Sequence, residues 1–307
     1  MNRVYDYIIA GIRLRSDINI VEAGVRGFSV FEATESAEHA DCHIHIDHNL
    51  NLEHHGECVK LSTSYVLEAD ADSHFMRTED GYLYSITRRK EGAKTTLFHI
   101  DTATNEIRTN IETKDGIDVS ILRFGIWVMF GVVMAPMGGI AIHSSAIVNR
   151  GKVVLFLGES GTGKSTHTRL WRENIEGSRL LNDDSPIVRI VDGSPRVYGS
   201  PWSGKTPCYK NEDYPIAGFC RLAQAPHNKI RRLPTILAIG ALLPSCPPIF
   251  AHDDKLQDMI CTTLSKIISQ TPLYRLECLP DAAAAELSRN TIIGEDEGIR
   301  GDNKVEY

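Results

Sequence analysis

Short stretches in which apolar and polar residues alternate recur along the first 115 residues. Alternation with a period of two is typical of a strand that buries one face. Turn-forming clusters separate the stretches, for example at 78–81 and 101–105. The pattern therefore predicts an antiparallel, β-rich domain over 1–115. Its expected strands are 7–14, 27–32, 42–47, 58–67, 81–87, 95–100 and 106–112.

Beyond residue 115 the pattern changes, and apolar helices alternate with strands. The most apolar run follows Asp118, ends at Gly138, and is too short to span a membrane, so it predicts a buried helix. A mixed α/β domain is expected over 116–293, followed by a polar, frayed tail over 294–307. Its expected strands are 140–148, 152–157, 180–184, 186–191, 196–198, 218–222 and 273–278, and its further helices are 164–174, 235–243, 256–269 and 281–290.

A glycine-rich motif lies between an expected strand and an expected helix. Residues 158–166 read Gly-Glu-Ser-Gly-Thr-Gly-Lys-Ser-Thr and match the phosphate-binding pattern G-x-x-x-x-G-K-S/T in full. In such a loop, backbone N–H groups at the start of a helix surround a phosphate. Lys164 would contact the β and γ phosphates, and the Ser165 hydroxyl would bind Mg²⁺. We therefore predict ATP and Mg²⁺ as ligands. The residues expected around the nucleotide are Gly158, Glu159, Ser160, Gly161, Thr162, Gly163, Lys164, Ser165 and Thr166.

A pair of acids, Asp183 and Asp184, arrives one helix after the glycine motif. Because the intervening helix is short, the strand that carries them can lie directly beside the strand that leads into the motif. One carboxylate can then bind the metal ion, and the other can accept a proton from an attacking hydroxyl. The alternative is a turn, since Asn-Asp-Asp-Ser-Pro is also good turn chemistry.

A histidine, His143, lies on the expected strand that forms a hairpin with the strand of the glycine motif. It could contact phosphate or orient an acid. A single histidine in a buried strand is also often a core residue with satisfied hydrogen bonds. The spacing leaves these two interpretations open.

These features resemble the shared core of two kinase families, ATP-dependent phosphoenolpyruvate carboxykinase and HPr kinase/phosphorylase. Both families have a histidine strand, a Ser-Gly-x-Gly-Lys-Ser/Thr loop and a pair of aspartates in this order. Here the corresponding segments are 142–148, 154–165 and 181–184, and the resemblance covers about 140–185. It implies a carboxykinase-like phosphate-loop core built on a mixed sheet.

The resemblance also implies roles for individual residues. Lys164 would be a phosphate ligand, and Ser165 and Asp183 would be the Mg²⁺ ligands. Asp184 matches the proton acceptor of HPr kinase, and His143 matches its active-site histidine.

The sequence departs from both families outside this core. Thr166 stands where HPr kinase has a glutamate, and residues 216–222 lack its acidic Mg²⁺ ligand and its Arg-Gly signature. The carboxykinases are far longer than this chain. Residues 199–205 read Gly-Ser-Pro-Trp-Ser-Gly-Lys and form a candidate substrate loop, with a surface turn as the alternative. Its candidate substrate residues are Trp202, Ser203 and Lys205.

The predicted function is therefore an ATP- and Mg²⁺-dependent kinase that phosphorylates a hydroxyl, with a serine in a protein, in a peptide or free as the expected acceptor. The β-rich domain would recognise the substrate or a partner. Two alternatives stay open: a carboxykinase-like enzyme that acts on a small carboxylate, and a non-catalytic nucleotide-binding regulator.

The amino-acid composition limits the classes of partner that we expect. The formal net charge of −7 and pI of about 5.9 argue against a nucleic-acid binder, and we expect no membrane segment. Seven scattered cysteines without a C-x-x-C pair indicate reduced thiols in a cytoplasmic protein. The oligomeric state stays open, a homo-oligomer included.

Histidines and cysteines crowd the segment from residue 39 to residue 58. Such ligands could bind Zn²⁺. Because two of the histidines alternate with apolar residues along a strand, they could equally form its polar outer face. The residues in question are His39, Cys42, His43, His45, Asp47, His48, His54, His55 and Cys58.

Overall fold

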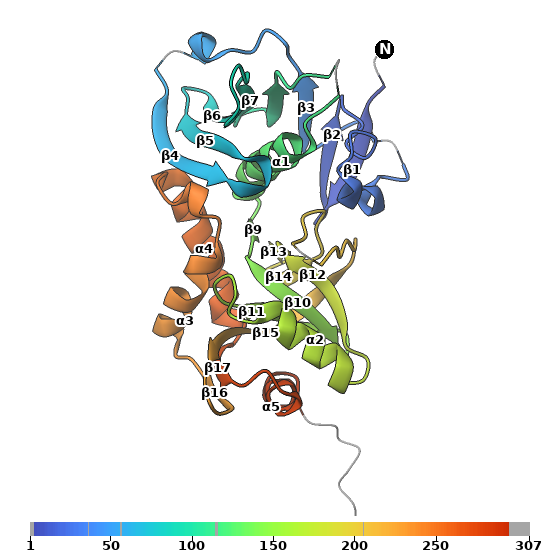
Figure 1. Ribbon diagram of the computed structural model, residues 1–307, viewed down its shortest axis with the longest axis vertical. Coiled ribbons are helices and arrows are strands. Elements are labelled where there is room, and N and C mark those ends of the chain that lie inside the picture. Colours follow the sequence, from blue (N-terminus) through green and yellow to red (C-terminus); the bar gives the residue numbers. More distant parts are fainter. Residues whose placement is uncertain (1–2, 36, 56, 114–115, 205, 295–307) are drawn as a thin grey trace, which may run out of the picture.

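The structure is a computed structural model that describes residues 3–35, 37–55, 57–113, 116–204 and 206–294. These residues form a mixed α/β fold with one sheet above the other, as Figure 1 shows. The first sheet has eight strands in the order β1-β2-β3-β8-β7-β6-β5-β4. Its elements are β1 (Tyr5–Ile9), β2 (Ile12–Ser16), the short 3-10 helix η1 (Arg26–Phe31), β3 (Cys42–Ile46), η2 (Leu52–His55), β4 (Val59–Val66), η3 (Leu67–Ala69), β5 (Ala71–Arg77), β6 (Gly81–Arg88), β7 (Thr96–Asp101) and β8 (Glu106–Thr109).

The second sheet has nine strands, seven of them in the order β12-β10-β11-β15-β14-β13-β9, with β17 pairing with β15 and β16 pairing with β17. The elements of this half are α1 (Val119–Met134), β9 (Gly139–Ala141), β10 (Ser144–Asn149), β11 (Lys152–Leu157), α2 (Lys164–Asn174), β12 (Arg179–Asp184), β13 (Ile187–Val191), β14 (Ser194–Tyr198), β15 (Asp213–Gln224), β16 (Lys229–Arg232), α3 (Thr235–Leu242), η4 (Leu243–Ser245), η5 (Pro248–Phe250), α4 (Asp254–Gln270), β17 (Leu273–Cys278) and α5 (Ala282–Ile292). The end of the chain, 295–307, lies outside the described residues.

Three predictions about the first sheet are wrong. The expected strand 7–14 is a hairpin of β1 and β2, because Ala10 and Gly11 both adopt positive φ and form a two-residue turn. The expected strand 27–32 is the helix η1, whose buried Phe28 and Phe31 are spaced by one 3-10 turn. The sheet is also not purely antiparallel, since β3 pairs in parallel with both β2 and β8. Strand β5 corresponds to none of the expected strands.

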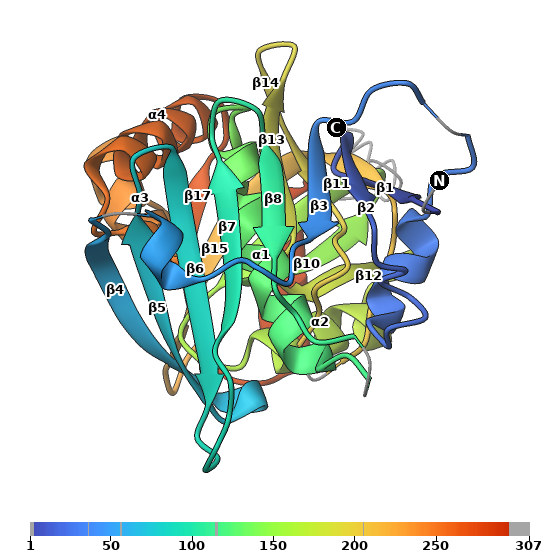
Figure 2. The same ribbon diagram turned by 90° about the horizontal axis from the view of Figure 1, so that it is seen from above.

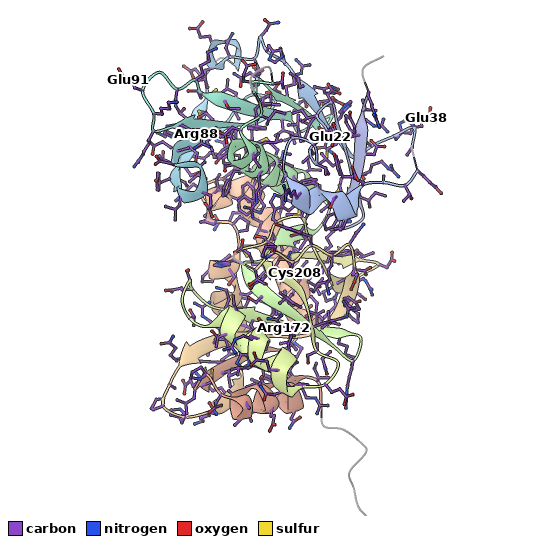
Figure 3. All side chains as sticks on the ribbon, turned by 45° about the vertical axis from the view of Figure 1, so that its right-hand side comes forward. Glu22, Glu38, Arg88, Glu91, Arg172 and Cys208 are labelled. Carbon is purple, nitrogen blue, oxygen red and sulfur yellow. The ribbon has the colours of Figure 1, made fainter. Side chains whose placement is uncertain are left out.

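The predicted apolar helix is confirmed as α1, and the side chain of Asp118 caps it by accepting a hydrogen bond from the Ile121 amide. Arg88 of β6, labelled in Figure 3, donates to the same carboxylate and so joins the helix to the first sheet. As Figure 2 shows, α1 lies beneath this sheet, where it contacts β6 and β7. Its other end leads into β9 of the second sheet.

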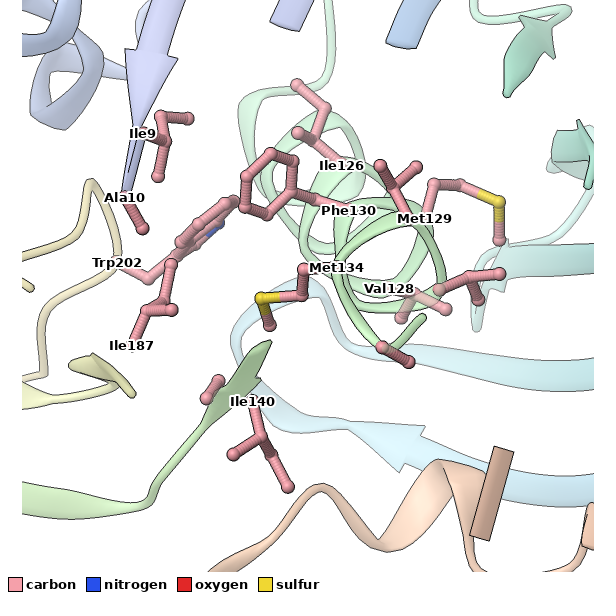
Figure 4. Close-up of a cluster of buried hydrophobic side chains, with 14 of the residues drawn as sticks. Ile9, Ala10, Ile126, Val128, Met129, Phe130, Met134, Ile140, Ile187 and Trp202 are labelled. Atoms are coloured by element: carbon pink, nitrogen blue, oxygen red, sulfur yellow. The ribbon is translucent and has the colours of Figure 1, made fainter. Parts of the chain in front are cut away.

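One hydrophobic cluster runs through both halves of the molecule. Figure 4 shows Ile9 of the first sheet and Phe130 of α1 on either side of Trp202, with Met134 of α1 lying towards Ile187 and Ile140 of the second sheet. The Trp202 ring packs edge-on against Phe28 of η1 at a centroid distance of 5.6 Å. The two sheets are therefore held together by shared apolar burial.

The strand order of the second sheet differs from the sequence-based expectation at one important place. The strand of the acid pair, β12, does not lie beside β11, because β10 lies between them and is antiparallel to both. The carboxyl ends of β11 and β12 and the first residue of β10 therefore meet at one edge, where Ser144 pairs with both Leu157 and Asp184. The expected strand 140–148 is also divided, and His143 lies in the break between β9 and β10.

Helices cover this sheet on two sides in Figure 1. α2 contacts β10, β11 and β12, while α4 contacts β9, β13 and β14. Within the described residues, no helix combines the length and the apolar character that a membrane span requires.

Candidate functional site

The glycine loop, residues 158–163, connects the end of β11 to the start of α2. Gly158, Gly161 and Gly163 all have φ between 83° and 153°, a region that favours glycine. No heavy atom lies within 4 Å of the position that a Cβ would take on Gly161 or on Gly163, so the space beside them is open. The loop thus exposes backbone beside the N-terminus of an eleven-residue helix, which is the arrangement that accommodates a polyphosphate.

Lys164 is the first residue of α2, and its side chain folds back over the loop. Its Nζ donates hydrogen bonds to the carbonyl oxygens of Gly158 at 2.7 Å and Glu159 at 3.3 Å. Burial lowers the pKa of Lys164, and the charges of Asp184 and Asp183 oppose that effect. The ammonium group is therefore held at the mouth of the loop, where it could bind an anion.

The carboxylate of Asp183 is the most enclosed acid of the site, with 6% of the residue exposed. The Ser165 hydroxyl donates to it, at 3.2 Å from Oδ1 and 3.1 Å from Oδ2. A second hydroxyl, that of Ser145, also donates to Oδ1, because β10 pairs Ser145 directly with Asp183. These oxygen atoms form a set of hard ligands that could hold Mg²⁺. Sequence reasoning missed Ser145, although a polar residue within a fully buried strand was a signal.

Asp184 ends β12 in a different environment. Its φ of +134° is unusual for a residue other than glycine, and such conformations are concentrated at functional sites. About 42% of its side chain is exposed, and its Oδ1 lies 3.6 Å from His143 Nε2. The backbone of His143 is fixed by a hydrogen bond from its amide to the Ser245 carbonyl at 2.7 Å. Burial and the charge of Lys164 lower the pKa of His143, against the opposing effect of both aspartates.

The segment 199–204 is anchored against the acid pair and is not a surface turn. The Asn182 side chain donates to the carbonyl oxygens of Ser200 and Trp202, and the Gly204 amide donates to the Asp183 carbonyl at 2.6 Å. Trp202 and Ser203 are both 3% exposed. Lys205, the remaining candidate substrate residue, lies outside the described residues.

A pocket of about 340 Å³ opens beside Asp184 and His143. Its walls come from α1, from the segment 244–248 and from η3 of the first half, so residues far apart in the sequence form it together. Arg123 of α1 lies in this wall and donates from Nη2 to the Ser203 carbonyl at 2.7 Å. Apolar side chains make up much of the remainder, among them Phe124, Trp127, Trp202, Pro244, Pro247 and Pro248.

Two cations of the site had no signal in the sequence analysis. Arg123 was part of the expected buried helix. Arg221 lies on β15 in register with Leu157, the last residue of β11, and its charge contributes to lowering the pKa of Lys164. The guanidinium of Arg221 is held by the Ala241 carbonyl at 3.0 Å. Residues 216–222, which lack the HPr kinase signature, therefore still bring a positive charge to the loop.

Among the side chains that the structure describes, the histidines and cysteines between residues 39 and 58 lie in different places in and around the first sheet and do not form one cluster. Cys42 points inward and is buried, and Cys58 packs beside a separate apolar cluster of Leu50, Leu83 and Leu97. His43 and His45 lie together with Asp17. The side chains of His54 and His55 lie outside the described part of the structure. A metal site that uses the cysteines is thus not formed by the described residues.

No model of a protein family matches this chain, and no curated protein matches it. Among solved structures, the HPr(Ser) kinase/phosphatase from Coxiella burnetii is similar, with 14% identity, a TM-score of 0.31, and coverage of 50% of this chain and 96% of that chain. The similarity is distant, and the carboxykinase-like core stays a prediction.

Proposed function

We propose that this protein is an ATP- and Mg²⁺-dependent kinase that transfers the γ-phosphoryl group to a hydroxyl, with a serine in a protein, in a peptide or free as the expected acceptor. One observation carries the proposal. Lys164, Ser165, Asp183 and Asp184 converge at a single sheet edge, between the glycine loop and the pocket. A site that only bound nucleotide would not need the second, exposed carboxylate.

The nucleotide side of the site is formed by the loop and the start of α2. The open loop backbone and Lys164 would hold the phosphates, and the carboxylate of Asp183 and the hydroxyl of Ser165 would hold Mg²⁺. When bound, Mg²⁺ neutralises charge that develops on the transferred phosphoryl group. Ser145 keeps the Asp183 carboxylate in place through its own hydrogen bond.

The acceptor side is formed by Asp184 and the pocket. Asp184 would take the proton of the acceptor hydroxyl while that oxygen bonds to the γ phosphorus and the bond from this phosphorus to the ADP oxygen breaks. The products are ADP and a phosphate ester. His143, 3.6 Å from this carboxylate, would orient it.

The size and lining of the pocket also indicate which acceptors would fit. A volume of about 340 Å³ accommodates one side chain or a small molecule. Trp127 and Trp202 provide an apolar wall, and Arg123 provides a cation. Among the described residues, no carboxylate lies within ion-pair distance of Arg123. A hydroxyl-bearing acceptor with an apolar part and an anionic group would therefore fit.

Arg123 also favours one alternative function. A guanidinium near a phosphate loop could hold the carboxylate of a small acid, as a carboxykinase-like enzyme would require. The two functions differ in products. One yields a phosphate ester, and the other releases CO₂ from oxaloacetate.

An experiment with γ-labelled ATP separates the candidates. The protein is incubated with free serine, with oxaloacetate and with proteins from a cell lysate, and the label and CO₂ are followed. Label on serine or on a protein supports the kinase, whereas CO₂ release supports the carboxykinase-like enzyme. Nucleotide binding without transfer would leave a non-catalytic regulator. Lys164→Ala should abolish any transfer, while Lys229→Ala, an exposed lysine on β16, should not.

A further inference from the structure

A second group of potential metal ligands lies in the first sheet, apart from the glycine loop. Asp17, His43 and His45 each offer one ligand atom, and these three atoms lie within 4.8 Å of one another. Asp17 follows β2, and both histidines belong to the neighbouring β3. All three residues are partly buried, so they are neither sealed in the core nor free on the surface.

The local structure explains why these side chains meet. His43 and His45 are two residues apart on β3 and so share one face of the sheet, while the alternate residues Cys42 and Ile44 are buried on the other face. The amide of Asp17 donates to the Ile44 carbonyl at 2.9 Å, which holds the carboxylate against that strand. The two imidazole rings lie 3.6 Å apart between centroids.

The hydrogen bonds of His45 depend on which of its two ring nitrogens carries a proton. Asp17 Oδ1 lies 3.0 Å from His43 Nε2, and Asp17 Oδ2 lies 3.3 Å from His45 Nδ1. The other ring nitrogen of His45, Nε2, contacts the carboxylate of Glu106. A neutral imidazole has one N–H, so a neutral His45 donates either to Glu106 or to Asp17, whereas only the protonated ring would donate to both. If it donates to Glu106, its Nδ1 lone pair faces a carboxylate oxygen, and a cation between them would relieve the repulsion.

We propose that Asp17, His43 and His45 bind a divalent transition-metal ion, with Zn²⁺ as the expected ion. Two imidazoles and one carboxylate are a ligand set that zinc uses when it keeps a fourth position for water. Ligand atoms about 2.0–2.1 Å from a tetrahedral zinc ion are about 3.3–3.4 Å apart. The Asp17 oxygens lie 3.0 Å and 3.3 Å from the two histidine nitrogens, and one atom from each of the three residues lies within 4.8 Å of the others. Small side-chain rotations would therefore complete the site.

Glu106 would act as a positioning residue for this ion. Metal-bound histidines commonly donate their second N–H to a carboxylate, which selects the tautomer and orients the ring. Glu106 lies on β8, where it pairs in register with His43, and its carboxylate reaches Nε2 of His45. The sheet thus supplies both the ligands and their support.

The site lies where a bound ion would also stabilise the first sheet. Only three residue pairs join β2 to β3, so the β1–β2 hairpin is attached to the rest of the sheet by a short parallel pairing. The turn of this hairpin also contacts the second half of the molecule, since Arg189 donates to the Ala10 carbonyl. A bound ion would link the end of β2 to β3 and stabilise this hairpin.

Zinc titration of the full chain, freed of metal with a chelator, tests the proposal. Calorimetry should show one tight equivalent of Zn²⁺ and a rise in the unfolding temperature. His43→Ala and Asp17→Asn should each weaken this binding by more than about 100-fold, and Glu106→Gln by about 10- to 100-fold. His74→Ala, which changes a histidine on β5 outside the cluster, should leave the affinity unchanged.

Two further measurements keep the result unambiguous. Circular dichroism and thermal unfolding in chelator establish that each variant is folded, so that a loss of affinity reports on the site. His143→Ala tests whether zinc binds at the glycine-loop site instead. The proposal is overturned if no tight equivalent binds, or if binding survives His43→Ala and is lost in His143→Ala.

Discussion

Nε2 of His143 lies 3.6 Å from Oδ1 of Asp184, while the adjacent acid, Asp183, is turned toward the hydroxyls of Ser145 and Ser165. Two consecutive carboxylates thus have different surroundings. One is enclosed by hydroxyl donors from β10 and from the start of α2, and the other is half exposed at the pocket. This separation underlies the different roles that we propose for them.

Replacement of Asp184 tests the proton acceptor. In Asp184→Asn the amide cannot take a proton, so we expect kcat for phosphoryl transfer to fall by about 10²- to 10⁴-fold while nucleotide affinity changes little. Transfer of label from ATP and nucleotide binding are measured on the same preparations. Asp192→Asn, an exposed turn residue between β13 and β14, is the control and should keep wild-type turnover. Unchanged turnover in Asp184→Asn would rule out this role.

Replacement of Asp183 should change the Mg²⁺ dependence of nucleotide binding. An amide offers a neutral oxygen to the metal and loses the charge that balances Mg²⁺, so we expect the Mg²⁺ concentration for half-maximal nucleotide binding to rise at least about tenfold. Fluorescence titration with a labelled nucleotide at increasing Mg²⁺ measures this shift. If the Mg²⁺ dependence of Asp183→Asn matches that of the wild type, Asp183 is not a metal ligand.

Arg123 should influence the acceptor and not the nucleotide. Arg123→Met keeps much of the apolar stem and removes the guanidinium, so we expect KM for an anionic acceptor to rise about tenfold or more while KM for ATP stays constant. Steady-state kinetics with an acid and its amide as acceptors checks the charge dependence. An equal effect on both would indicate that Arg123 acts only through its bond to the Ser203 carbonyl.

His167 should make stability depend on pH. Burial lowers its pKa to about 4, and its ring contacts the Ser288 hydroxyl and the Trp171 indole. In the unfolded chain the His167 imidazole has the ordinary histidine pKa of about 6.5, so it takes up a proton there at a higher pH than in the folded protein. The free energy of unfolding should therefore fall by up to roughly 3 kcal/mol as the pH is lowered from about 6.5 to 4. Urea unfolding across this range should show a smaller pH dependence in His167→Gln. Parallel profiles for both proteins would contradict the assignment.

Two glycine-to-alanine changes should have opposite effects. A Cβ on Gly125 of α1 would lie 2.2 Å from the Phe98 ring, so Gly125→Ala should destabilise the protein by about 1–3 kcal/mol through overpacking. A Cβ on Gly240 of α3 meets no heavy atom within 4 Å, so Gly240→Ala should stabilise it by about 0.5–1 kcal/mol through helix propensity. Denaturant unfolding measures both. Equal effects would show that packing against β7 does not limit α1.

Local signals in the sequence were enough to predict several elements. The expected start of the apolar helix at Asp118 matches α1, whereas its expected end at Gly138 lies four residues beyond the last helical residue, Met134. The expected strands 186–191 and 196–198 are confirmed as β13 and β14, which pair as an antiparallel hairpin. The prediction was wrong at 7–14 and 27–32, because an Ala10 turn with positive φ and a single 3-10 turn leave little trace in a period-two pattern.

By itself, the sequence determined the features that depend on neighbouring residues: the glycine loop, the helix that follows it, and an acid pair at the end of a strand. Only the tertiary structure decided that β10 lies between β11 and β12 and that Ser145 therefore reaches Asp183. It also placed Arg123 and Arg221 near the loop and the pocket. The physical reason is that strand order and helix docking depend on apolar burial between distant segments, which no local pattern encodes.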